Sequence, residues 1–159
     1  MSKEWENCAA LLGRTHPNYP DDLQVVVHQG GPRFSSLPPE YIWVKIIGYD
    51  QGIFKGTIRN KPHNLTDYKL GSEILFHIPS NKSCKPVMLT QEVVHESKQW
   101  TVVPCTKGYN EILFDPPSKF VEKIFPNLGA DNGPEAFTYF CGICGGVMVV
   151  RAKGSGSDP

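Results

Sequence analysis

Two of the five cysteines lie three positions apart in the segment "FCGICGGVMVV", residues 140–150. Thiols at this spacing, Cys141 and Cys144, can form half of a tetrahedral metal site or a redox-active dithiol. Two glycines follow the pair and allow backbone amides to point at the sulfur atoms. The chemistry expected of this segment is therefore metal binding or thiol–disulfide exchange.

Cys105 is the third sulfur ligand that the metal interpretation needs. It stands in "PCTKG", where a second C-x-x-C turn would have its other cysteine at Gly108. Structural zinc takes four ligands in a tetrahedron, so Cys105, Cys141 and Cys144 require a fourth. The sequence leaves open which donor this is: Cys84, His95, His77 or water. We predict Zn²⁺ as the cofactor; the alternative is that no metal binds and the cysteines are buried as small apolar groups.

The redox interpretation meets an electrostatic objection. A thioredoxin-type C-x-x-C pair stands at a helix N-terminus, where the helix dipole and free amides lower the pKa of the attacking thiol. Here "GGVMVV" follows the pair, and glycines followed by β-branched residues are typical of a strand. The sequence therefore argues against a thioredoxin-type activity.

No complete catalytic motif accompanies the cysteines. The five histidines stand singly, and "HQGGPRF" lacks the Lys-Ser/Thr pair of a phosphate-binding loop. We therefore predict a protein that binds rather than reacts. A zinc-dependent hydrolase with an open metal position is the alternative.

The middle of the chain has the pattern of a small twisted sheet. "YIWVKII" and "IFKGTIRN" alternate apolar and polar residues around the turn "GYDQG", which predicts a β-hairpin. "SEILFHIP" predicts a third strand. Short strands with glycine-marked corners cannot bury both faces alone, so we expect them to curl into a small half-barrel or barrel.

The order of these segments resembles a family of bacterial domains. From Tyr41 to Ile78, about a quarter of the chain, "YIWVKI", "FKGTIRNKPHNL" and "YKLGSEILFHI" resemble the YegJ-like domains of unknown function. That family has a W-V-K strand, a G-x-L/I-x-N-x-P segment and a K-x-G-D-x-V-x-F strand in this order. Ser72 stands where the family usually has aspartate. The resemblance implies a bacterial accessory or immunity module that neutralises a cognate toxin by binding it.

The last third of the chain resembles a zinc ribbon in which two cysteine turns face each other. "NEILF" predicts a short strand, and Asp115 and Pro116 are a typical N-cap and first residue of a helix. An apolar stripe from Phe120 to Phe125 supports that helix, with Pro126 and Gly129 at its end. "FTYF" and "VMVV" predict strands on either side of the C-x-x-C pair.

These patterns predict an α+β, β-rich fold. We expect an irregular lead-in over residues 1–40 and a YegJ-like β domain over residues 41–104, built as an antiparallel half-barrel or barrel. A zinc-ribbon-like subdomain with one short helix follows over residues 105–153. Residues 154–159 predict a flexible tail.

The charge and the hydropathy of the chain argue against nucleic acids and membranes as its main partners. Sixteen basic and sixteen acidic residues cancel, which argues against strong binding to a phosphate backbone; a weak nucleic-acid-binding module is the remaining alternative. No apolar run is long enough to cross a bilayer, and the first residues lack a signal-peptide core. We therefore expect no membrane association and a cytoplasmic location.

Another protein is the partner that the sequence favours. Trp43, Tyr49, Tyr68 and Trp100 exceed what a few short strands need for a core. Aromatic side chains at a surface are common anchors of protein interfaces, so these four are the predicted partner-binding residues.

Overall fold

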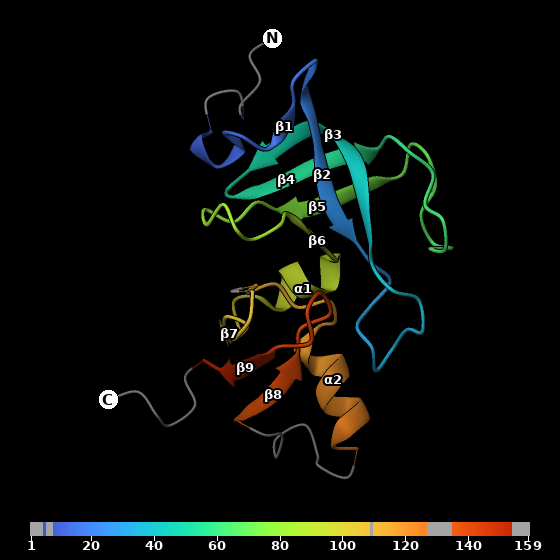
Figure 1. The fold of residues 1–159 in the computed structure, drawn as a ribbon. Helices are drawn as coiled ribbons and strands as arrows, with labels where there is room; N and C mark the ends of the chain where they lie inside the picture. Colours follow the sequence, from blue (N-terminus) through green and yellow to red (C-terminus); the bar gives the residue numbers. More distant parts are fainter. Residues whose placement is uncertain (1–4, 6–7, 109, 127–134, 154–159) are drawn as a thin grey trace. The chain divides into compact units, whose positions relative to one another are not determined.

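The computed structural model of the chain divides into two compact units, Met1–Leu89 and Thr90–Pro159 (Figure 1). It describes residue 5 and residues 8–108, 110–126 and 135–153. A six-stranded sheet forms the first unit and a three-stranded sheet the second, so the predicted α+β, β-rich fold is confirmed. In the described part of the chain, no helix has the length and apolarity required to span a membrane.

The first unit is a small closed barrel. Its elements are a short 3-10 turn η1 (Ala9–Leu11) and the strands β1 (Thr15–His16), β2 (Tyr19–Val27), β3 (Glu40–Asp50), β4 (Ile53–Ile58), β5 (Glu73–His77) and β6 (Val87–Leu89). Strands β2 to β6 pair antiparallel in chain order. The ring closes because β6 also pairs in parallel with β2, where the Val26 amide donates to the Pro86 carbonyl at 2.9 Å.

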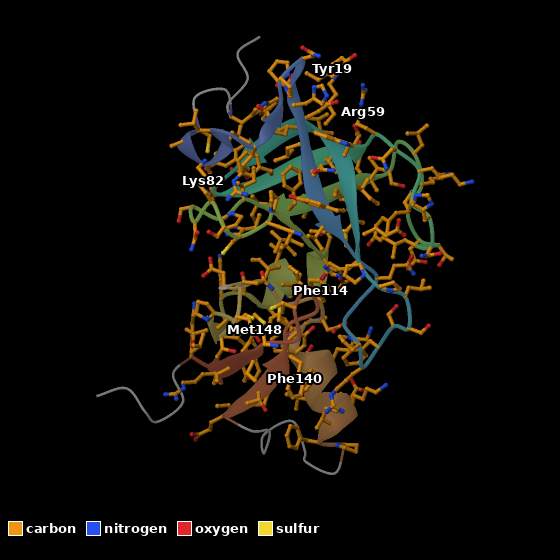
Figure 2. All side chains as sticks on the ribbon, in the orientation of Figure 1. Tyr19, Arg59, Lys82, Phe114, Phe140 and Met148 are labelled. Carbon is orange, nitrogen blue, oxygen red and sulfur yellow. The ribbon has the colours of Figure 1, made fainter. Side chains whose placement is uncertain are left out.

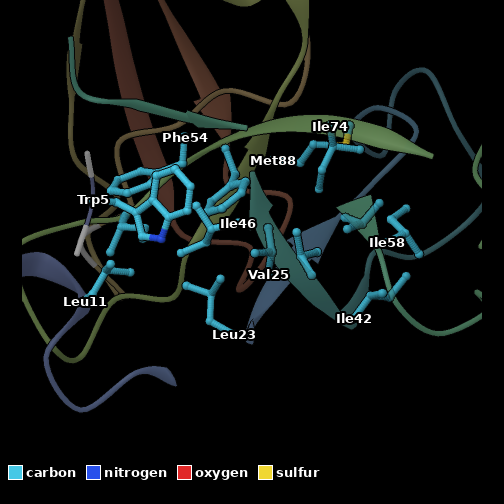
Figure 3. Packing of buried hydrophobic residues seen from close by; sticks show 14 of the residues in the cluster. Trp5, Leu11, Leu23, Val25, Ile42, Ile46, Phe54, Ile58, Ile74 and Met88 are labelled. Carbon is cyan, nitrogen blue, oxygen red and sulfur yellow. The ribbon is translucent and has the colours of Figure 1, made fainter. Parts of the chain in front are cut away.

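Alternation along the strands fills the interior of this barrel. Ile42, Val44 and Ile46 of β3 point inward and are almost fully buried (Figure 3), and Trp43 and Lys45 between them point outward. Gly56 of β4 sits directly against β3: a Cβ atom there would lie 2.4 Å from Val44 Cγ1. A side chain at position 56 would therefore force the two strands apart.

The amino-terminal segment differs from the irregular lead-in expected over residues 1–40. Strand β2 contributes Leu23, Val25 and Val27 to the buried cluster, and Trp5 and Leu11 pack into it as well. The prolines and glycines of residues 1–40 indicate turns. They do not indicate that the residues between the turns are buried in the core. The barrel cannot close without β2, because β2 pairs with β3 on one side and with β6 on the other.

The second unit places its three-stranded sheet beside two helices. Its elements are α1 (Gln91–Glu96), β7 (Trp100–Val103), α2 (Pro117–Ile124), β8 (Ala136–Phe140) and β9 (Val147–Ala152). Strand β9 is central and pairs antiparallel with both β7 and β8. Because β7 belongs to this sheet, the second unit begins at Thr90, whereas the sequence suggested a boundary between residues 104 and 105.

The strand expected from "NEILF" is absent from the structure. Residues 110–114 form no strand, because the Asn110 side chain bonds both the amide and the carbonyl of Ile112. These two bonds hold the segment in a turn.

The start of the following helix also differs from the expectation. Helix α2 begins at Pro117 with Pro116 as its N-cap. The buried Asp115 carboxylate does not cap it and instead accepts a hydrogen bond from the Tyr139 hydroxyl at 2.8 Å. Gly129, expected near the helix end, and the expected tail over residues 154–159 lie outside the described residues.

Helix α2 covers one face of the sheet through aromatic contacts. The Phe120 ring stacks on Phe137 with centroids 4.7 Å apart and contacts Tyr139 at 5.5 Å. Met148 and Val150 of β9 are fully buried on this same face. This face is therefore the core of the second unit.

His28 is a fully buried titratable residue directly after β2. Its Nε2 lies 3.1 Å from the Met88 carbonyl oxygen, and its Nδ1 accepts the Gly30 amide at 3.1 Å. A neutral ring with its proton on Nε2 satisfies both contacts. Burial lowers the pKa of His28 to about 4, against the opposing effect of the Met88 hydrogen bond.

We predict that the first unit loses stability as the pH falls from about 6.5, the ordinary histidine pKa, towards 4. In that interval the unfolded chain binds a proton at His28 and the folded chain does not. The loss is on the order of 3 kcal/mol. Histidine ring NMR provides the direct measurement: the His28 resonances should stay constant from pH 8 to pH 5. A His28 midpoint near 6.5 would contradict the prediction.

Candidate metal centre

Both cysteine turns lie at the same end of the three-stranded sheet. Cys105 follows the end of β7, and Cys141 follows the end of β8. Strand β9 begins between these two strand ends, since Val147 pairs with Phe140. The antiparallel sheet thus brings together thiols that are far apart in the sequence. Figure 2 labels Phe140, the last residue of β8, and Met148, the second residue of β9.

The two turns have the same backbone hydrogen bond. The Cys105 amide donates to the Asn110 carbonyl at 2.8 Å, and the Cys141 amide donates to the Gly146 carbonyl at 2.8 Å. Each bond spans five residues and closes the turn that carries the cysteine. The two turns are therefore structural equivalents, as the ribbon-like pattern of the sequence predicts.

The hydrogen bonds from backbone amides to sulfur are also the same in the two turns. The Lys107 amide points at Cys105 Sγ and the Ile143 amide at Cys141 Sγ, each at 3.4 Å. The Asn110 side chain adds a third contact, from Nδ2 to Cys141 Sγ at 3.4 Å. Donors directed at sulfur stabilise the thiolate form that binds metal. Sequence reasoning missed Asn110, although its place in the first turn matches that of Gly146 in the second.

Three sulfur atoms form one compact group. The Sγ atoms of Cys105, Cys141 and Cys144 all lie within 4.8 Å of one another, and those of Cys105 and Cys144 are 3.2 Å apart. Cys105 and Cys141 are buried and Cys144 is exposed. A tetrahedral zinc ion bonded at ~2.3 Å separates its sulfur ligands by about 3.8 Å, so the group needs only small adjustments to hold an ion. The predicted ligands are close enough to bind a metal together.

The thiols of this group are unequal. Burial raises the pKa of Cys105, but hydrogen bonds from the Gly108 and Lys107 amides and from the neighbouring thiols outweigh it and lower the pKa to about 7. Burial, and next the hydrogen bond with Cys105, raises the pKa of Cys144. Cys105 therefore ionises more readily than Cys144 and favours the thiolate form that binds a cation.

The group that the structure describes has three ligands, and the identity of the fourth stays a prediction. Within the described residues, the metal-binding group consists of the three cysteines alone, and His95 of α1 does not belong to it. Cys84 and His77 are residues of the first unit. Gly108 stands in the first turn where Cys144 stands in the second.

Glycines make room for the sulfur atoms. A Cβ atom at Gly146 would lie 2.4 Å from Cys105 Sγ, and one at Gly142 would lie 2.4 Å from the Phe114 ring. Gly145 has a φ of 75°, a conformation that other residues rarely adopt. The two glycines after the C-x-x-C pair are thus required for different reasons: one for space and the other for backbone conformation.

Comparison of the chain with protein-family models, curated proteins and solved structures finds no match in any of the three. Its function is therefore inferred from the geometry of the chain itself.

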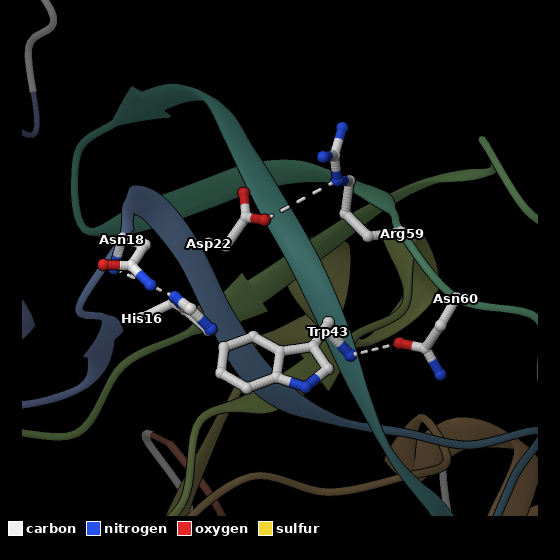
Figure 4. A network of polar contacts seen from close by, with 6 residues as sticks. All are labelled: His16, Asn18, Asp22, Trp43, Arg59 and Asn60. Carbon is white, nitrogen blue, oxygen red and sulfur yellow. Dashed lines mark hydrogen bonds and ion pairs between the residues drawn. The ribbon is translucent and has the colours of Figure 1, made fainter.

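The four predicted partner-binding aromatics are all half-buried. Tyr49 and Tyr68 pack against the barrel core, and the Trp100 ring meets the Phe137 ring edge-on at 5.7 Å. Trp43 lies on the outer face of β3 (Figure 4). Its ring meets the His16 ring at 5.2 Å, so Trp43 belongs to an aromatic cluster outside the barrel.

We predict that Gly146→Ala weakens metal binding and Gly108→Ala does not. A methyl group at position 146 would overlap Cys105 Sγ, which is buried and cannot retreat, whereas one at position 108 meets only ordinary contact at 3.7 Å. Overpacking of this kind costs about 1–3 kcal/mol. Competition with a chromophoric chelator measures the affinity for Zn²⁺. Equal affinity of both alanine variants would show that crowding at Gly146 has no bearing on the site.

Proposed function

We propose that the protein is a zinc-binding, non-enzymatic module that recognises another protein. The observation that carries the zinc assignment is the group of three sulfur atoms within 4.8 Å of one another. Amides aimed at Cys105 and Cys141 support it, because they favour thiolates at the positions where a cation would sit. A thiolate donor set on a β-ribbon framework is typical of structural zinc.

The composition of the donor set supports a structural rather than a catalytic ion. Catalytic zinc is usually held by histidines and carboxylates, or by two cysteines and a histidine, which leave it a strong Lewis acid. Three thiolates carry more negative charge than the ion itself and weaken its pull on a bound water. The open corner beside Gly108 is the one observation that favours the alternative, a zinc-dependent hydrolase.

A surface suited to a protein partner lies on the outer face of β3. Tyr41 and Ile47 are exposed there on either side of Trp43, and Tyr19 extends the cluster through its ring contact with His16. We call Tyr19, Tyr41, Trp43 and Ile47 the aromatic stripe. Tryptophan and tyrosine are the residue types most enriched at the energetic centres of protein interfaces.

The charges next to the stripe favour a protein over a nucleic acid. Arg59 Nε lies 3.6 Å from Asp22 Oδ2 in Figure 4, and Lys55 Nζ lies 3.0 Å from Glu73 Oε1. These cations already have carboxylate partners in the barrel. Phosphate-backbone binding relies on surplus cations, and the sixteen basic residues of this chain are matched by sixteen acidic ones.

A bacterial toxin is the partner that we propose. The support is the resemblance of residues 41–78 to YegJ-like domains, and the aromatic stripe lies partly within that segment. In this proposal the barrel occludes the toxin, the zinc ion stabilises the second unit, and both act in the cytoplasm.

We predict about one zinc per chain in protein purified without chelator, and loss of that zinc in Cys144→Ser. Cys8→Ser is the matched control, because Cys8 lies in the first unit and should leave the zinc content unchanged. For a structural ion, Cys144→Ser should also lower the thermal stability of the second unit. A folded Cys144→Ser variant that loses only a hydrolytic turnover of the wild type would establish the alternative.

We predict that Trp43→Ala weakens binding to a toxin encoded next to this protein's gene by at least tenfold. A central aromatic anchor is typically worth about 2 kcal/mol or more when truncated. Leu70→Ala provides the control, since Leu70 is 63% exposed and lies outside the stripe. Titration calorimetry with the purified neighbour gives both affinities. Unchanged binding by Trp43→Ala would show that the aromatic stripe is not part of the interface. If the wild type does not bind the neighbour, the proposed toxin is not the partner.

A further inference from the structure

The first cysteine turn supplies one sulfur where the second supplies two. The two turns share their closing backbone hydrogen bond and their amide-to-sulfur bond, so Gly108 in the first is equivalent to Cys144 in the second. Tetrahedral zinc uses four ligands. The fourth corner of the group therefore lies beside Gly108.

No described side chain fills this corner. A Cβ atom built on Gly108 would lie 3.7 Å from Cys144 Sγ, and apart from the adjacent residues no other described atom lies within 4 Å of it. The backbone of Gly108 is outside the left-handed region, so its conformation suits any residue. Position 108 could hold a cysteine directed at the group, and the chain has only a hydrogen atom there.

The second unit has no thiol outside the group, and its one thioether, that of Met148, is fully buried on the core face of the sheet. Its cysteines are the three of the group, and His95 is its one histidine and does not belong to the group. The residues that the structure does not describe include neither cysteine nor histidine. A thiolate ligand for the fourth corner must therefore come from outside this unit.

On the basis of the proposed zinc site, we propose that the bound ion keeps its fourth position open beside Gly108 and takes an external thiolate there. Cys144 is exposed, so solvent reaches the group on the side where that corner lies. Metals held by thiolates favour further soft ligands. The exchange involves no oxidation: the incoming thiol releases its proton to solvent, its sulfur bonds to the metal, and a bound water leaves.

Cobalt substitution of the full-length chain tests this proposal, because Co²⁺ absorption reports both its geometry and its sulfur ligands. Adding 2-mercaptoethanol to the cobalt-loaded wild type should raise the sulfur-to-metal absorption by about one third, as three Co–S bonds become four. Gly108→Cys should show the higher absorption from the start and respond to no added thiol. Gly108→Ala, which places a methyl carbon one bond length from the sulfur position of Gly108→Cys, should still bind cobalt but lose the response to added thiol.

Two arms distinguish the source of the thiolate. Saturation at lower concentration by a short cysteine-containing peptide indicates a cysteine of a partner protein, and saturation at lower concentration by 2-mercaptoethanol indicates a free small thiol. A cobalt-loaded wild type that ignores both, or that responds to imidazole alone, overturns the proposal and leaves the zinc site intact. Failure of the wild type to bind cobalt or zinc would instead overturn the proposed function.

Discussion

The second unit depends on holding three thiol groups within 4.8 Å of one another. Thiolates repel each other at this distance, so the arrangement requires either shared protons or a cation between them. The pKa values agree with shared protons. Hydrogen bonds lower the pKa of Cys105 against the effect of burial, whereas burial, and next the hydrogen bond with Cys105, raises the pKa of Cys144. An ion bound in the proposed site would replace that arrangement, because all three sulfurs could then be ionised at once.

The surrounding structure is organised around this requirement. The Thr106 amide donates to the Val147 carbonyl at 3.1 Å, and the Val147 amide donates to Thr106 Oγ1 at 3.2 Å. These bonds fix the first turn to the central strand, while the second turn continues directly from β8. The Phe114 ring packs against Gly142, the residue after Cys141. In a sheet of only three strands, few other contacts could keep both turns in place.

The sequence predicted elements and donors well where a local pattern determined them. Alternation in β3 and β4 revealed the hairpin, and the spacing of Cys141 and Cys144, with Cys105 in a similar turn, revealed the group. The prediction from sequence failed where a contact with a residue far away in the chain determines the local structure. Asp115 has the properties of an N-cap, but its carboxylate accepts a hydrogen bond from the Tyr139 hydroxyl. The N-cap is Pro116, and the helix begins at Pro117. Asn110 lies in an apparent strand, yet its side chain bonds Ile112 and Cys141. The closing contact of β2 with β6 likewise joins segments that no local pattern connects.

The barrel and the cysteine group solve the problem of stability in different ways. The barrel has its own buried cluster around Phe76 and Ile46 and needs no ion to close. It can therefore carry half-buried aromatic residues outside without depending on them for its fold. Trp43 is already fixed by the His16 ring and by the bond from its own amide to Asn60 Oδ1 at 2.8 Å. A side chain fixed before binding loses little rotamer entropy when a partner covers it. The same contacts that keep Trp43 from full exposure thus lower the entropy cost of the interface that we propose for it.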